Sequence, residues 1–265
     1  MENIIDVKNL SVKFGDFTAV KDISFAVPTG EIFAFLGPNG AGKSTTIKVL
    51  TTLLEKTSGS VTVGNMTTEG NRNDIRKQFG IVFQDSSLDD DLTAFENMDF
   101  HGALYGIPAS VRRPKIQELF ALVDLADRQK DLVRNYSGGM KRRLEIARGL
   151  LHEPKILFLD EPTLGLDPQT RNHMWDYIKK LNKEKGMTIF FTTHYMEEAA
   201  RMATMVAIID HGSIIASGTA ESLIAQSGEA KLEDAFLKLT GETIRDTEAG
   251  SVDQLRQHAR AWGRR

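Results

Sequence analysis

The sequence predicts an α/β fold in which antiparallel strands come first and a parallel sheet is interrupted by a helical block. A glycine loop, residues 37–44, follows the apolar run of residues 32–36 and precedes a helical pattern. Apolar and polar residues alternate over residues 3–27, which favours antiparallel strands with one buried face. A mostly helical stretch, about residues 94–151, then separates the glycine loop from further strand-like runs.

Composition narrows the class of protein. The 265 residues suffice for one large α/β domain or two small ones. The net charge of -3 argues against nucleic acid as the main partner, and the absence of cysteine excludes disulfides, thiol catalysis and cysteine-ligated metals. The acidic N-terminus and the lack of an apolar run near ~18 residues predict a soluble chain, so that any membrane role would require a partner.

The elements follow in chain order. Ile47, Leu50, Leu53 and Leu54 should share one face of the helix after the glycine loop, and another helix should surround residues 174–181. The strand candidates are residues 5–12, 20–27, 32–36, 58–65, 80–83, 156–159, 188–191 and 205–209.

The glycine loop fits G-x-x-x-x-G-K-[ST], a phosphate-binding pattern. Its glycines let successive N–H groups face phosphate oxygens, and the following helix adds its positive dipole end. Lys43 should reach the β and γ phosphates, and the Ser44 hydroxyl should bind Mg²⁺. A turn without a ligand is the alternative, which the flanking strand and helix disfavour. The predicted phosphate-binding residues are Gly37, Pro38, Asn39, Gly40, Ala41, Gly42, Lys43, Ser44 and Thr45.

Polar side chains follow three of the strand candidates, where α/β proteins place their ligands. Asp160 should hold Mg²⁺ through water, and Glu161 is suited to orient or deprotonate an attacking water. Gln84 could reach the metal or the water, and His194 the γ phosphate. Each of these residues alone would more often be a solvated surface residue, but together they indicate a polar ring around one triphosphate.

A second loop suited to an anion occurs at Ser137-Gly138-Gly139, before a helix that starts near Lys141. Two interpretations remain open from these residues. The loop is either only a helix cap, or it serves a nucleotide held by another copy of the chain.

Taken in order, these motifs resemble those of the ATP-binding subunits of ATP-binding cassette (ABC) transporters over residues 1 to about 220. The resemblance implies a RecA-like P-loop NTPase core with an N-terminal antiparallel β subdomain and a helical subdomain inserted at about residues 90–150. It adds Phe14 as the aromatic ring that stacks on adenine and Asp167 as the aspartate of the D-loop. It makes Glu161, His194, Lys43 and Gln84 the catalytic residues, Ser44, Gln84 and Asp160 the metal ligands, and ATP and Mg²⁺ the cofactors.

The resemblance also implies partners. Two subunits would pack head to tail, so that the glycine loop of one and Ser137-Gly138-Gly139 of the other enclose each ATP. A separate membrane permease would then hold the pair, expected to be a homodimer, at the inner face of the cell membrane. Two other classes stay open: a non-transport ABC ATPase that acts on a nucleic-acid or ribosomal partner, and a scaffold that binds ATP without turnover.

Finer features resemble drug, polysaccharide and sodium exporters, with daunorubicin-resistance ATPases as the nearest group. They are found in residues 84–91, 136–144 and 232–241. Tyr136 and Met140 depart from the usual Leu and Gln. Residues 221–265 are expected to form a partly helical extension, and its arginine-rich end is either a frayed tail or an amphipathic helix that docks on a partner or an anionic membrane surface.

Overall fold

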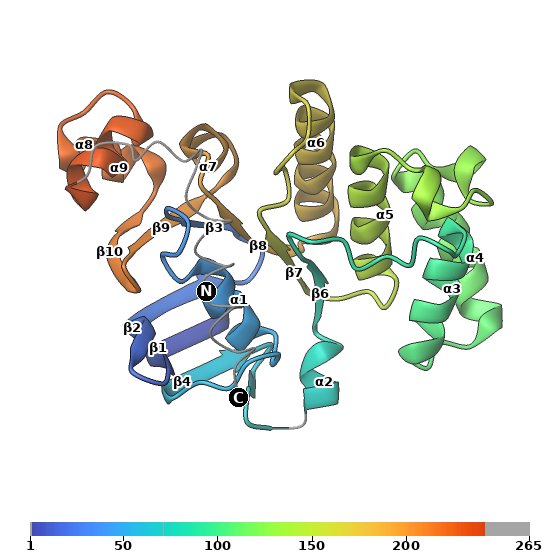
Figure 1. The fold of residues 1–265 in the computed structure, drawn as a ribbon, viewed down its shortest axis with the longest axis horizontal. Coiled ribbons are helices and arrows are strands. Elements are labelled where there is room, and N and C mark those ends of the chain that lie inside the picture. Colours follow the sequence, from blue (N-terminus) through green and yellow to red (C-terminus); the bar gives the residue numbers. More distant parts are fainter. Residues whose placement is uncertain (1, 71, 242–265) are drawn as a thin grey trace, which may run out of the picture.

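The computed structural model describes residues 2–70 and 72–241, and it contains a parallel sheet with one antiparallel edge strand (Figure 1). The strand order is β10-β9-β3-β8-β7-β6, and every neighbouring pair except β10 and β9 is parallel. This confirms the predicted fold class. The strands are β3 (Ile32–Leu36), β6 (Phe79–Val82), β7 (Ile156–Asp160), β8 (Thr188–Thr193), β9 (Met205–Asp210) and β10 (Ser213–Gly218).

An antiparallel sheet packs against one side of this core, as the alternation over residues 3–27 predicts. Its strands are β1 (Asn3–Phe14), β2 (Phe17–Pro28), β4 (Ser58–Val63) and β5 (Met66–Thr67), in the order β2-β1-β4-β5. Phe25 of β2 lies 5.6 Å from Phe33 and 6.0 Å from Phe190, ring centre to ring centre. The two sheets therefore share one apolar layer.

Helix α1 (Lys43–Leu50) begins within the last two residues of the glycine loop and lies between the two sheets (Figure 1). The predicted continuation of its apolar face to Leu53 and Leu54 is wrong, because the helix ends at Leu50. Thr52 adopts a left-handed backbone (φ 59°), and Leu53 is 54% exposed. A short helix, α2 (Arg72–Arg76), follows later in the chain.

The opposite face of the parallel sheet is covered by α6 (Pro168–Lys185) and α7 (Met196–Met202). The Trp175 ring of α6 meets Phe191 of β8 edge-on at 4.8 Å. Because both rings are fully buried, they fix α6 on the strand that precedes His194.

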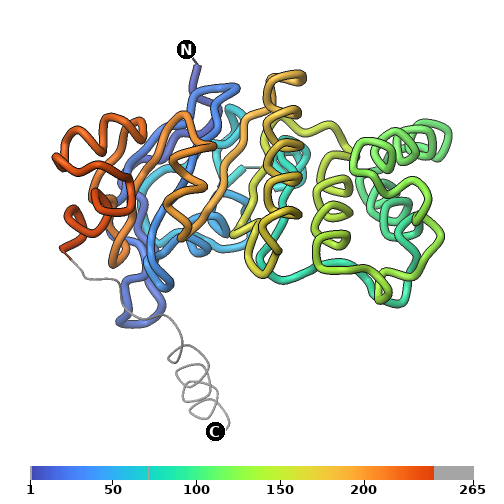
Figure 2. The backbone as a smooth tube through the Cα atoms, turned by 90° about the horizontal axis from the view of Figure 1, so that it is seen from above, coloured from blue at the N-terminus to red at the C-terminus, as the bar shows by residue number. Residues whose placement is uncertain are grey.

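A helical lobe stands to one side of β6 in both views (Figures 1 and 2). It contains α3 (Ala94–Leu104), α4 (Ala109–Leu122), two short 3₁₀ turns (Ala126–Arg128 and Val133–Asn135) and α5 (Gly138–Leu150). In the chain it falls between β6 and β7, which confirms an inserted helical subdomain. Its α5 lies close to the sheet, since a Cβ on Gly80 would come 2.3 Å from the Gly149 carbonyl oxygen.

After β10, which the sequence did not predict, the chain forms α8 (Ala220–Ser227) and α9 (Leu232–Thr240). These helices pack against β10 and α7. The boundary at residue 220 stays a prediction, and the arginine-rich end lies outside the described residues. Within residues 2–70 and 72–241, no helix combines the length and the apolar character that crossing a membrane requires.

Candidate active site

The glycine loop needs glycine at several positions for reasons of space and backbone angle. A Cβ on Gly37 would lie 2.2 Å from the Ile209 carbonyl oxygen, and Gly40 and Gly42 have φ angles of 82° and 107°. Gly42 also passes close to β2, where a Cβ would lie 2.8 Å from the Ala19 carbonyl oxygen. The loop is therefore held tightly between β9 and β2 and delivers the chain into α1 at Lys43.

Lys43 is folded back into this loop. Its Nζ donates to the carbonyl oxygens of Gly37 at 2.8 Å and Pro38 at 3.1 Å, and it lies 3.1 Å from Glu161 Oε1. Only 4% of the Lys43 surface is exposed. A buried ammonium group with three oxygen partners is a preformed positive centre at the start of α1.

Glu161 stands directly after β7 with a left-handed backbone, φ 47°. This conformation is uncommon for a residue with a side chain, and the Glu161 N–H is held by a hydrogen bond to Thr192 Oγ1 at 3.0 Å. Its second carboxylate oxygen lies 3.0 Å from His194 Nδ1. Burial alone would raise the pKa of Glu161, but the His194 contact and the Lys43 charge together lower it below its usual value.

Asp160, Ser44 and Thr192 form a neighbouring group of oxygen atoms. Ser44 Oγ donates to Asp160 Oδ1 at 3.2 Å, and Thr192 Oγ1 donates to the same oxygen at 2.6 Å. Mg²⁺ prefers oxygen ligands and commonly keeps several waters beside one or two carboxylates and substrate phosphates. This donor set fits that requirement. No cluster of three acidic, histidine or cysteine side chains suited to a metal occurs among the residues that the structure describes.

Gln84 is placed differently from the other predicted ring members. Its side chain is exposed, and the hydrogen bond that fixes the residue runs from Arg142 Nη2 to its backbone carbonyl oxygen at 3.0 Å. The structure therefore brings Lys43, Glu161 and His194 together directly, whereas Gln84 is positioned by the helical lobe.

The second anion loop, residues 137–139, lies at the start of α5, with Ser137 and Gly138 exposed and Gly139 half-buried. Ser137 Oγ accepts from the Met140 N–H at 3.3 Å, which makes it the N-cap. A Cβ on Gly139 would lie 2.5 Å from Thr170 Cγ2, and Asp167 caps α6 by accepting from the Thr170 N–H at 3.0 Å. Gly139 thus lies beside Thr170 in the first turn of α6, which Asp167 caps, and α5 is separated from α1 in both views (Figures 1 and 2).

Phe14 ends β1 at the tip of a hairpin and is half exposed. Sequence reasoning did not select Phe17, its cross-strand partner, whose ring is still more exposed. Two accessible aromatic rings therefore stand at this tip, where Phe14 is predicted to stack on adenine.

A further buried carboxylate, Glu198 of α7, also escaped sequence reasoning. It accepts from Thr163 Oγ1 at 2.8 Å and lies 3.4 Å from Arg171 Nε. The Arg171 guanidinium in turn lies 4.6 Å from the centre of the Tyr195 ring. Glu198 therefore ties together the segments that follow Glu161, Asp167 and His194.

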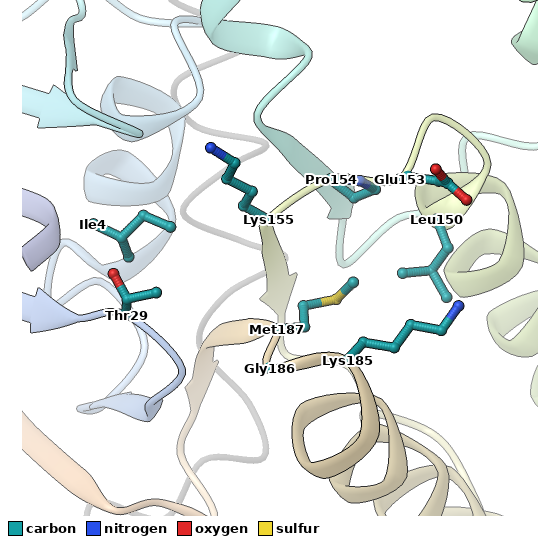
Figure 3. Close-up of a pocket in the computed structure, with 9 residues that line it drawn as sticks. All are labelled: Ile4, Thr29, Leu150, Glu153, Pro154, Lys155, Lys185, Gly186 and Met187. Carbon is teal, nitrogen blue, oxygen red and sulfur yellow. The ribbon is translucent and has the colours of Figure 1, made fainter.

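A hollow of about 300 Å³ lies at the opposite edge of the sheet, before the strands β7 and β8 begin (Figure 3). Its lining includes Lys155, Lys185 and Met187. The predicted catalytic residues follow the carboxyl ends of these strands, so the hollow is separate from the candidate active site.

The glycine loop closes around a buried lysine. A carboxylate lies beside that lysine and a histidine lies beside that carboxylate, at the ends of parallel strands. This combination defines a nucleotide-hydrolysing P-loop protein. The comparisons with known proteins narrow this class. The ABC transporter family model matches residues 20–164.

Two drug-resistance proteins are similar over nearly the whole chain. The linearmycin resistance ATP-binding protein LnrL of Bacillus subtilis is 41% identical over 92% of this chain and 76% of its own length. The daunorubicin/doxorubicin resistance ATP-binding protein DrrA of Streptomyces peucetius is 38% identical over 93% of this chain and 76% of its own length.

Solved structures agree with the fold. An ATP-binding subunit of an ABC transporter superposes with a TM-score of 0.81 at 30% identity, covering 89% of this chain and 99% of that one. The dimeric post-hydrolysis state of the cassette MJ0796, bound to ADP and phosphate, superposes with a TM-score of 0.74 at 28% identity, covering 81% and 98%. The chain belongs to the ATP-binding subunits of ABC transporters, and it is an ATPase of this family.

Proposed function

We propose that this chain drives a drug-type exporter by hydrolysing ATP between two copies of itself, at the inner face of the cell membrane and bound to a separate permease. The assembly of Lys43, Glu161 and His194 within hydrogen-bonding distance carries the proposal. The exporter class rests on similarity to proteins named for linearmycin and daunorubicin resistance. The transported compound is expected to be of that kind, a drug or antimicrobial metabolite.

In the proposed reaction, Lys43 exchanges its carbonyl partners for the β and γ phosphate oxygens of ATP. Glu161 accepts a proton from a water whose oxygen attacks the γ phosphorus, and the bond from that phosphorus to the ADP oxygen breaks. The lowered pKa of Glu161 leaves it ionised and able to accept this proton. His194 holds the Glu161 carboxylate and turns toward the γ phosphate.

Ser44 and Asp160, with Gln84 once its side chain turns inward, would hold Mg²⁺. Bound there, Mg²⁺ would neutralise charge on the phosphate oxygens. Thr192 supports the site by orienting Asp160 and the Glu161 N–H from one hydroxyl.

The second half of the site would come from residues 137–139 of a second copy. Their exposure and their place at the start of α5 suit an anion delivered by another surface. Asp167, which caps the first turn of α6 against which Gly139 lies, would contact the same partner. A dimeric cassette among the structural relatives supports this arrangement.

Replacing Glu161 with Gln tests the proposal. We expect ATP binding to persist, phosphate release to fall roughly 100-fold or more, and an ATP-dependent dimer to accumulate on size-exclusion chromatography. Wild-type turnover in this variant would remove Glu161 as the base. Affinity capture from solubilised membranes should recover a polytopic partner, whereas recovery of ribosomes would favour a non-transport ABC ATPase.

A further inference from the structure

Residues 83–87, here called the Q-loop, leave the sheet after β6 without regular secondary structure. Their backbone groups therefore need partners other than a neighbouring strand. Those partners come from α5, the helix that residues 137–139 begin. Three charged residues of α5, spaced by three positions, supply them: Arg142, Glu145 and Arg148.

Arg142 holds the start of the Q-loop. Its guanidinium donates to the carbonyl oxygen of Phe83 and, at 3.0 Å, to that of Gln84. The same group pairs with Glu145 Oε2 at 3.1 Å. Arg142 is 7% exposed, so its charge is nearly withdrawn from water.

Glu145 and Arg148 hold the other end. The Ser87 N–H donates to Glu145 Oε1 at 2.8 Å, and Arg148 Nη1 donates to the Ser87 carbonyl oxygen at 2.8 Å. Glu145 is only 2% exposed, and both of its oxygens are used. A single face of α5 thus fixes the Q-loop at both ends.

Stability alone does not account for these buried charges. Removing two ions from water is costly, and apolar residues of similar volume often stabilise a protein equally well or better. Here nearly every hydrogen bond of the ion pair is directed at the backbone of one irregular segment. That arrangement fixes geometry, which an apolar replacement would not do.

We infer that the buried Arg142–Glu145 pair is a positioning device that makes the Q-loop and the start of α5 move as one body. The inference rests on the proposed function, in which Gln84 serves the ATP of its own subunit and residues 137–139 serve the ATP of the facing subunit. The pair then links the two ATP sites of a dimer through each chain. Arg142 and Glu145 touch no substrate and act through Gln84 and Ser87.

The full-length Arg142→Met variant provides the first test. We expect kcat for ATP hydrolysis to fall on the order of 10- to 100-fold, because misplacing a catalytic group by about 1 Å can have that effect, while KM for ATP changes little. Hydrogen exchange at the amides of residues 84–87 should become faster, and exchange in α3 should stay as in wild type. Arg142→Lys keeps the positive charge and can still donate a hydrogen bond to the Q-loop, so it should recover part of kcat.

Arg112→Met is the matched control. Arg112 pairs with Asp99 at 2.6 Å and donates to the Ile107 carbonyl oxygen at 3.1 Å, so it resembles Arg142 in its partners. It lies within the lobe and does not contact the Q-loop. An equal loss of kcat in Arg112→Met would show that general loosening of the lobe is responsible and would overturn the inference.

A double variant guards against a trivial folding defect. Arg142→Met with Glu145→Leu replaces the pair by apolar side chains, which buried ion pairs commonly tolerate. Reduced kcat with fast Q-loop exchange in this folded protein would support positioning, whereas wild-type kcat would overturn it. If wild-type protein itself releases no phosphate, or Glu161→Gln turns over normally, the proposed function fails instead.

Discussion

The two anion loops of this chain have similar chemistry but opposite surroundings. The glycine loop is enclosed by β2 and β9, and its lysine already has three oxygen partners. Residues 137–139 are largely exposed, and apart from neighbouring residues no described atom lies within 4 Å of the position that a Cβ on Gly138 would take. The first loop is therefore surrounded by other parts of the same chain, whereas the second lies at the surface, where we propose that it meets the ATP of a second copy.

Because of this difference, we expect the glycine loop to govern ATP binding and residues 137–139 to govern ATP turnover. The enclosed loop has the lysine, the helix start and the neighbouring carboxylates that ATP binding needs. The exposed loop has only backbone donors and the hydroxyl of Ser137, so it should contribute once a second copy closes over it. Variants of the two loops should consequently fail at different steps.

The largest effect is expected for Lys43→Ala. Loss of the buried ammonium group should weaken ATP binding on the order of 100- to 1000-fold, as truncation of a buried charged partner commonly does. Isothermal titration calorimetry with separated subunits measures it. Lys48→Ala removes an exposed lysine from the same helix and should bind ATP normally. Unchanged affinity in Lys43→Ala would show that the enclosed loop does not hold the phosphates.

A smaller effect is expected for Ser137→Asp. Aspartate keeps the N-cap of α5 but places a negative charge where the facing subunit's triphosphate should arrive. We expect kcat to fall on the order of 10- to 100-fold while ATP affinity of the separated subunit stays unchanged. Ser137→Asn, an equally good cap without charge, should lose less activity. Weaker ATP binding in the Ser137→Asp monomer would contradict the separation of the two loops.

The smallest expected effect is the change in the free energy of unfolding of Glu161→Gln and its dependence on pH. The folded pKa of Glu161 lies below its unfolded value near 4.5, so its ionised form stabilises the native chain above that pH and the contribution is lost as pH falls further. At neutral pH, Glu161→Gln should lower the free energy of unfolding by about 1–3 kcal/mol in the absence of nucleotide, since Lys43 loses its counter-charge. Urea unfolding should show this difference shrinking toward about pH 4, and a constant difference would argue against the ion pair.

The sequence predicted the elements whose signals are local. Apolar runs ending in polar residues located β3, β7 and β8, and the glycine pattern located the loop after β3. The short β10 was missed because only Ile214 and Ile215 mark it and it pairs with β9 at the sheet edge.

The missing parts of the site depend on contacts between distant segments. Arg142 bonds to the Gln84 carbonyl across 58 positions, and Thr163 bonds to Glu198 across 35. Neither contact has a spacing that periodicity could reveal. A charged residue on a helix face is ordinarily solvated, so the burial of Glu145 and Glu198 could be seen only in the folded chain.

The folded-back Lys43 has a further consequence for how the site selects what enters it. To bind Lys43, a ligand must replace two carbonyl oxygens and separate the ammonium group from the Glu161 carboxylate. A lone phosphate ion offers few atoms for that exchange, whereas a nucleoside triphosphate offers oxygens on successive groups and a base on which Phe14 is predicted to stack. We therefore expect a triphosphate to displace the partners of Lys43 more readily than inorganic phosphate does.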